Sequence, residues 1–286
     1  MPRCIAFHSY KGGSGKTTIA SNLAAMLASK GFRVSLLDLD VYAPSLQSYF
    51  DYTPSVWLND FLHNTASLSK VMIDMTHRIE EYADRANVNR LGKLWIGFSN
   101  PDKEEIIKLD AEGRQSDASV RMLRNFIQLR EMLISEYDCD YVIIDTSPGI
   151  RYWSINSLAI ADTLLLTLKF DKLDMNGTRK MAHDIYDSLK KLGTKSFLLP
   201  NRMSGYCVPH TVVLNDRSQN TLSPHQIGSD ISATLSREIG MDIIAAIPCY
   251  CDIQFAIDEF LSVLRFPGHP FAKQLEMLAD AEQLKI

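Results

Sequence analysis

Short apolar runs alternate along the chain with segments in which apolar residues recur every three or four positions. Runs of this length are typical of buried strands, and the spaced segments indicate amphipathic helices, as at residues 120–134 and 177–192. The apolar runs cover residues 4–8, 34–37, 94–98, 141–144, 163–168, 196–199 and 243–247. Their alternation with helices predicts an α/β fold in three layers, with a mostly parallel twisted sheet and helices on both faces.

The chain of 286 residues contains no linker rich in Pro, Gly or Ser and no internal repeat. We therefore predict a single domain over residues 1–286. Residues 49–90 show the weakest pattern, and we expect them to form an insertion or a helical elaboration after the second strand.

A glycine-rich loop follows the first predicted strand and precedes a helical pattern. The loop reads Lys11-Gly12-Gly13-Ser14-Gly15-Lys16-Thr17-Thr18. Glycines let backbone N–H groups surround phosphates, the lysine at position 16 reaches phosphate oxygens, and a helix that begins here directs its N-terminus toward an anion. We interpret the segment as the phosphate loop of a nucleotide site.

This loop departs from the common phosphate-loop pattern at two positions. Tyr10 stands where that pattern has its first glycine, and Lys11 adds a second lysine. We expect Lys11 to lie too far from the phosphates held by its own loop to duplicate Lys16. It therefore needs another role.

Carboxylates follow two further apolar runs. Asp38 and Asp40 follow the second strand, and Asp145 follows the run at 141–144. Because the C-terminal ends of parallel strands share one edge, these groups are expected beside the phosphate loop. Thr17, Asp40 and Asp145 are then the candidate groups around Mg²⁺, with Asp145 holding one of its waters. Asp40 is also the candidate that orients an attacking water, whereas Asp38 fits a turn equally well.

Taken together, these residues resemble the MinD/ParA family of deviant Walker-A ATPases, which also includes Mrp-type iron–sulfur carriers and nitrogenase iron protein. The order and spacing of the motifs carry the resemblance, since each later motif is weak alone. The segments that match after the loop are Leu37-Asp38-Leu39-Asp40 with Pro44-Ser45, Asp145-Thr146-Ser147-Pro148-Gly149, Ala161-Asp162, Asp174 with Gly177-Thr178, Asn201-Arg202 and Ile247-Pro248.

The resemblance implies the P-loop NTPase fold and assigns roles to the site residues. ATP would bring two subunits face to face, and Lys11 would cross the interface to the phosphates of its partner. Gly149 would bring a backbone N–H close to the γ-phosphate. Asn201, with Arg202 and Pro248, would border the adenine, because an Asn amide matches the hydrogen-bonding edge of that base.

The function implied is that of a Mg²⁺-dependent ATPase with slow turnover and an ATP-dependent homodimer. Such a switch protein would position or regulate a cellular assembly through an activating or adaptor protein. Two alternatives stay open: an ATP-gated carrier for iron–sulfur or other metal centres, and a partition ATPase bound to DNA.

Cys249-Tyr250-Cys251 is the only segment that suggests the carrier. The carriers use a Cys-x-x-Cys pair and show Gly-Thr-Gly-Asp after the second switch, whereas this chain continues from Gly149 as Ile150-Arg151-Tyr152. We therefore predict that the two thiols are packed side chains and that no metal cluster is bound.

The charge pattern does not favour binding to DNA or to a membrane surface. The net charge is −4, and the most basic segment, 169–195, balances seven Lys/Arg with four Asp. Residues 271–286 are amphipathic but hold two lysines and three acidic residues, so we expect a helix that packs on its own domain. Five cysteines, no room for a signal peptide and no long apolar run predict a cytoplasmic protein, with any surface association peripheral.

Overall fold

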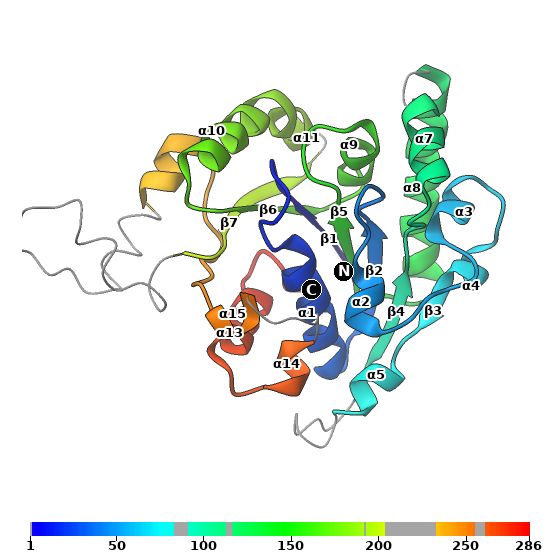
Figure 1. The fold of residues 1–286 in the computed structure, drawn as a ribbon, viewed down its shortest axis with the longest axis horizontal. Helices are drawn as coiled ribbons and strands as arrows, with labels where there is room; N and C mark the ends of the chain where they lie inside the picture. The colour runs from blue at the N-terminus through cyan, green and yellow to red at the C-terminus, as the bar shows by residue number, and fades with distance from the viewer. Residues whose placement is uncertain (1, 83–90, 113–115, 192, 204–232, 255–260) are drawn as a thin grey trace, which may run out of the picture.

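The computed structural model describes residues 2–82, 91–112, 116–191, 193–203, 233–254 and 261–286. Its centre is a seven-stranded sheet in the order β3-β4-β2-β5-β1-β6-β7 (Figure 1). The strands are β1 (Arg3–His8), β2 (Arg33–Leu39), β3 (Met72–Asp74), β4 (Lys93–Gly97), β5 (Tyr141–Thr146), β6 (Thr163–Leu168) and β7 (Lys195–Pro200). Only β3 runs antiparallel to its neighbour in this sheet, which confirms the predicted mostly parallel α/β architecture.

Helices connect the strands and cover both faces of the sheet. They are α1 (Lys16–Ser29), α2 (Leu46–Phe50), α3 (Leu58–Leu62), α4 (Leu68–Val71), α5 (His77–Glu80), α7 (Lys103–Glu112), α8 (Ser116–Ser135), α9 (Tyr152–Leu158), α10 (Lys172–Met181), α11 (Asp187–Lys191), α13 (Cys251–Gln254), α14 (Ser262–Arg265) and α15 (Pro270–Ala279). A π-helix over Ala182–Tyr186 joins α10 to α11, and residues 233–239 are also helical.

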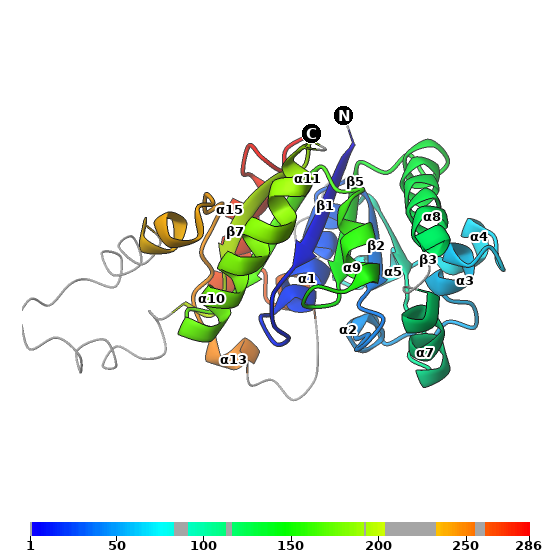
Figure 2. The same ribbon diagram turned by 90° about the horizontal axis from the view of Figure 1, so that it is seen from above.

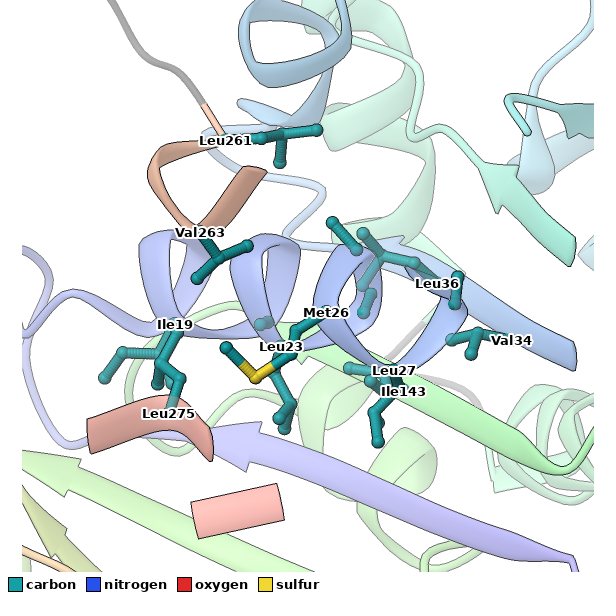
Figure 3. Packing of buried hydrophobic residues seen from close by; sticks show 14 of the residues in the cluster. Ile19, Leu23, Met26, Leu27, Val34, Leu36, Ile143, Leu261, Val263 and Leu275 are labelled. Atoms are coloured by element: carbon teal, nitrogen blue, oxygen red, sulfur yellow. The ribbon is translucent and has the colours of Figure 1, made fainter. Parts of the chain in front are cut away.

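Helix α1 is buried between one face of the sheet and the C-terminal helices. Figure 3 shows Ile19 and Leu23 of α1 beside Leu275 of α15 and Val263 of α14, with Ile143 of β5 in the same cluster. All five side chains are almost fully withdrawn from solvent. The amphipathic C-terminal segment thus packs on its own protein through α15, as predicted.

The opposite face is covered by α8, α9, α10 and α11, which lie on the other side of the sheet from α1 (Figure 2). Alternation along β1 divides its side chains between the two cores. Ile5 and Phe7 contribute to the core around α1, and Cys4 and Ala6 contribute to the core under α8–α11. A strand buried on both faces explains why the sequence reads as a continuous apolar run rather than as an alternating one.

One prediction about strands was wrong. Residues 243–247 form no strand, because their pairing with β7 is interrupted. Ile244 N donates to Leu198 O at 3.0 Å and Ile247 N donates to Pro200 O at 2.8 Å. Between these two hydrogen bonds the segment 243–247 advances by three residues but β7 by only two, so the regular strand register is lost. Only isolated bridges remain at Ile243 and Pro248. Within 49–90, α3, α4 and α5 confirm the predicted helical elaboration, and the structure adds the short edge strand β3.

No helix among the described residues is both long and apolar enough to cross a bilayer.

Candidate nucleotide site

The glycine-rich loop joins β1 to α1 at the C-terminal edge of the parallel strands (Figure 1). Gly13 and Gly15 have φ angles of 71° and 87°, in the left-handed region that favours glycine. A Cβ on Gly15 would also overlap the side-chain amide of Asn201. Helix α1 begins at Lys16 without a side-chain cap, so its first N–H groups are suited to an anion.

Lys16 is a buried cation at the base of this loop, with 5% of its surface exposed. Its Nζ donates to Ser9 Oγ at 3.0 Å, and Ser9 Oγ donates to Lys11 O at 2.7 Å. Among the described residues, no carboxylate lies within 4.0 Å of the Lys16 ammonium group. Because a buried charge is costly without a counter-ion, this arrangement favours an anionic ligand.

Thr17 and Asp145 are brought together as predicted for a metal site. Thr17 Oγ1 donates to Asp145 Oδ2 at 2.6 Å, and Asp145 is 1% exposed. Its other oxygen, Oδ1, is buried and has no hydrogen-bond partner within the described part of the chain. A hydroxyl beside an unbonded carboxylate oxygen fits Mg²⁺, which prefers oxygen ligands and retains waters.

Burial raises the pKa of Asp145 to about 7, although the Lys16 charge and the Thr17 hydroxyl act in the opposite direction. The ordinary pKa of an Asp is about 3.9, so the folded protein holds this proton over a range in which the unfolded chain has lost it. Asp145 therefore destabilises the unliganded protein increasingly as pH rises from about 4 to about 7, with a slope of up to about 1.4 kcal/mol per pH unit.

We expect Asp145→Asn to flatten this dependence. The measurement is the free energy of unfolding in denaturant between pH 5 and pH 8, without nucleotide and with a chelator present. Asp38 and Asp40 remain in both proteins, so the difference between the two curves reports the titration of Asp145 together with its charge coupling to these two carboxyls. Curves that stay parallel throughout would contradict the assignment.

Asp38 and Asp40 lie at the end of β2 and differ in what they bind. Asp38 is 1% exposed and accepts the N–H groups of Asp40 and Leu46 at 3.1 and 3.4 Å. Burial and the neighbouring carboxylates raise its pKa well above the ordinary value. Asp38 thus stabilises the turn. Asp40 is 7% exposed, so it is the carboxylate nearer to the solvent side of the site. Burial raises the pKa of Asp40, and the hydrogen bond with Ser147 and the Lys16 charge partly offset this rise.

Gly149 connects the segment after β5 to the phosphate loop. It has a φ of 80°, and its N–H donates to Ser9 O at 2.8 Å. The expected contact between this N–H and a γ-phosphate therefore requires that hydrogen bond to break. Any such exchange would couple the phosphate loop to residues 147–149.

Asn201, Arg202 and Pro248 line one pocket beside Gly15, as expected for an adenine site. The other lining residues are Thr18, Ile19, Ile247, Tyr250, Ile253 and Phe271. Asn201 Nδ2 donates to Ser14 O at 2.7 Å and Asn201 Oδ1 accepts from Arg202 N at 2.9 Å. The amide is thus already bonded in this structure, and the apolar side chains in the lining, among them Ile247 and Phe271, offer a surface for a flat base.

The remaining loop residues occupy distinct positions. Gly12 is exposed and faces Pro148, while Ser14 is buried with its hydroxyl 2.9 Å from that of Thr167. Thr18 Oγ1 lies 2.7 Å from the hydroxyl of Tyr49. Lys11 is half-buried, and its charge lowers the pKa of Asp174, a carboxyl whose pKa burial raises overall.

Sequence reasoning missed His8, the last residue of β1. Thr146 Oγ1 donates to Phe7 O at 2.7 Å, so His8 Nδ1, 2.7 Å from the same hydroxyl, must donate to it. Burial, reinforced by the Lys16 charge, lowers the pKa of His8 to about 3. This neutral imidazole joins β1 to β5 directly before the loop, and a single His in an apolar run carries no signal of that role.

The prediction that both thiols are packed side chains is wrong for Cys251, which is exposed, whereas Cys249 is half-buried. Within the described ranges, no group of three or more His, Cys, Asp or Glu side chains is arranged to hold a metal ion.

The chain is similar to one protein-family model and to several curated proteins. The family model, described as an AAA domain, matches residues 2–197. The chain is 29% identical over 162 residues to the cytosolic Fe-S cluster assembly factor CFD1 of Phaeosphaeria nodorum, covering 54% of this chain and 48% of the relative. It is 27% identical over 183 residues to the chromosome partitioning protein ParA of Myxococcus xanthus, covering 64% and 58%. These alignments thus span about half the length of the curated relatives.

The fold is also that of solved structures. The septum site-determining protein MinD from Pyrococcus horikoshii, in complex with Mg-ADP, superposes with a TM-score of 0.67 over 98% of this chain and 95% of that chain, at 21% identity. This likeness confirms the P-loop NTPase fold. MinD/ParA ATPases are structural neighbours of this chain, and ParA and iron–sulfur assembly factors are among its relatives. The family model matches most of the chain, and the matched residues include the glycine-rich loop, β2 and β5. The chain therefore belongs to the AAA-domain family of P-loop proteins.

Proposed function

We propose that this chain is a Mg²⁺-dependent ATPase switch that binds ATP as a face-to-face homodimer and hydrolyses it slowly. One observation carries the proposal: the buried Lys16 ammonium group lies at the same loop as the Thr17–Asp145 pair, whose second carboxylate oxygen has no hydrogen bond among the described residues. The first is complementary to a phosphate and the second to a metal ion. Mg-ADP in the Pyrococcus horikoshii MinD structure supports the same ligand class here.

Binding would use groups that the fold already presents. Lys16, with the N–H groups of Gly12, Gly13, Ser14, Gly15, Thr17 and Thr18, would hold the phosphates. Thr17, Asp145 and Asp40 would surround Mg²⁺, which when bound neutralises phosphate charge. The base would occupy the pocket of Asn201, Arg202 and Pro248, with Asn201 exchanging its bond to Ser14 O for the edge of adenine.

Hydrolysis would need two further groups. Asp40 would orient the attacking water, provided that it is ionised, and the nearby Lys16 charge favours that form. Lys11 has no carboxylate within 4.0 Å in the described structure, so its ammonium group is available to a phosphate. Delivered by the partner subunit, it would stabilise charge in the transition state only within the dimer. Gly149 would respond to the γ-phosphate by releasing Ser9 O.

As a cellular role, we propose that the two nucleotide states position or regulate an assembly in the cytoplasm through an activating or adaptor protein. A dimer that forms with ATP and separates after hydrolysis presents two different surfaces to such a partner. Slow turnover would make the dimer lifetime the timing element.

Replacing Asp40 by Ala is expected to trap the dimer. Without a group to orient water, the variant should bind Mg·ATP, hydrolyse it more slowly and accumulate as a dimer. The measurement is mass by light scattering with ATP, with ADP and without nucleotide. Asp280→Ala removes an exposed carboxyl at the end of α15 and serves as the control, expected to match wild type. An Asp40→Ala protein that stays monomeric with ATP would count heavily against the scheme.

The alternative of a metal-centre carrier is favoured by the similarity to an iron–sulfur assembly factor. The exposed Cys251 and half-buried Cys249 would have to meet their counterparts across a dimer. Anaerobic reconstitution with iron and sulfide decides between the functions. A colourless protein whose absorption matches that of a Cys249→Ser, Cys251→Ser variant would exclude the carrier.

The alternative of a DNA-bound partition ATPase is favoured by the similarity to ParA. Exposed basic residues on α10 and α11, among them Lys180, Lys190 and Lys191, would supply the contacts. ATP-dependent retention on nonspecific DNA that falls steeply with salt is required for this role.

A further inference from the structure

A third lysine, Lys169, lies at the phosphate loop, although it belongs to none of the sequence motifs of the site. It directly follows β6, and its Nζ is 3.4 Å from the position that a Cβ on Gly13 would take. Gly13 is exposed and stands between Lys11 and Lys16 in the loop. The Lys169 ammonium group therefore lies against the outer surface of the loop that is proposed to hold phosphates.

The backbone around Lys169 is held by residues of the same site. Lys169 N donates to Asp174 Oδ2 at 2.8 Å, and Asp174 N in turn donates to Asp171 Oδ1 at 2.8 Å in the first turn of α10. On the other side, Leu168 O accepts from Asn201 N at 2.9 Å. Bonds on both sides fix where the side chain starts, and from this point its flexible stem reaches Gly13.

The charge of Lys169 has no counter-ion among the described residues. It is half-buried, and in the described part of the chain its ammonium group has no hydrogen bond and no carboxylate within 4.0 Å. The carboxylate nearest along its own backbone, Asp174, is 1% exposed and uses one oxygen for the Lys169 N–H. Burial raises the pKa of Asp174, which weakens it further as a partner. Lys11, Lys16 and Lys169 thus leave three positive charges around one loop.

We propose that Lys169 binds the polyphosphate of the nucleotide held by its own subunit, as a cation additional to Lys16 and Lys11. The proposal rests on the proposed ATP site and deepens it. A charge-assisted hydrogen bond from an ammonium group to a phosphate oxygen is stronger than one between neutral groups. Lys169 approaches from β6 rather than from the loop itself, so it adds charge without adding a side chain to the glycines.

The test is the affinity for a nonhydrolysable ATP analogue with Mg²⁺, measured by calorimetry at low and at moderate salt. Lys169→Met is expected to weaken binding about tenfold at low salt and to reduce its salt dependence. Lys169→Arg should retain most of the affinity, since it keeps the charge. The effect should persist in a Lys11→Ala background, because Lys169 acts within its own subunit.

Lys172→Met is the matched control, since Lys172 is exposed at the first position of α10 and its loss changes net charge equally. It should shift affinity by less than about twofold. Equal affinities for Lys169→Met and Lys172→Met, or a Lys169→Arg protein as weak as Lys169→Met, would overturn the proposal. A wild-type protein that does not bind the analogue would instead refute the proposed function itself, and with it this inference.

Discussion

Lys16→Met is expected to abolish useful affinity for Mg·ATP, with a loss of at least about 100-fold. Lys16 is 5% exposed and its Nζ donates only to Ser9 Oγ at 3.0 Å in the described structure, so a phosphate would complete its bonding. Removing one partner of a buried charge pair costs about 3–5 kcal/mol, which corresponds to a factor of about 100 or more in affinity. Titration of Mg·ATP by calorimetry measures the loss directly.

The unliganded Lys16→Met protein should remain folded. Methionine keeps the length of the stem, and the substitution also removes a buried ammonium group that has no carboxylate partner within 4.0 Å among the described residues. Circular dichroism and thermal melting without nucleotide check this. Lys172→Met, exposed at the start of α10, is the control of equal charge change. A Lys16→Met protein that binds Mg·ATP as wild type does would remove the nucleotide site from this loop.

Lys11→Ala is expected to slow ATP hydrolysis about 100-fold while leaving the affinity of a subunit for Mg·ATP nearly intact. A donor that stabilises transition-state charge contributes about 3 kcal/mol to the barrier, whereas Lys16 carries most of the ground-state binding. The measurement is the steady-state rate at saturating ATP, together with the dissociation constant of the nonhydrolysable analogue. Lys103→Ala, which removes a lysine from α7, controls for the change in net charge.

A mixture of two inactive variants decides whether Lys11 acts across the interface. In a heterodimer of Lys11→Ala with Asp40→Ala, the Lys11→Ala subunit retains Asp40 and receives Lys11 from its partner. One of the two sites is then complete, so an equal mixture should recover about a quarter of the wild-type rate if subunits pair at random. A mixture as inactive as its components would show that Lys11 works within its own subunit.

The order of strands and helices around the loop was predictable because its determinants are local. Glycines at 13 and 15 adopt positive φ, which few other residues tolerate, and the apolar run of β1 reflects burial on both faces. The positions of Asp40 and Asp145 followed from one rule, that parallel strands end at a common edge. Spacing along the chain is enough for such inferences.

Other features were not predictable, since they depend on the meeting of distant segments. Residues 243–247 are as apolar as a strand, but the register against β7 breaks after Ile244. β3 has three residues, too few for a periodic signal. Lys169 belongs to a mixed-charge segment that suggests a solvated helix face. Only the short distance between its ammonium group and Gly13 shows that it lies at the phosphate loop.

The amino-acid sequence alone specifies a phosphate loop with an additional lysine, the carboxylates that accompany it and an α/β sheet, because motif chemistry and hydrophobic periodicity are properties of neighbouring residues. Tertiary structure decides which side chains already have partners. Asn201 donates to Ser14 O and the Gly149 N–H donates to Ser9 O, whereas Asp145 Oδ1 has no hydrogen-bond partner in the described part of the chain. Hydrogen bonds between residues more than a hundred positions apart require the folded register, and no local pattern encodes them.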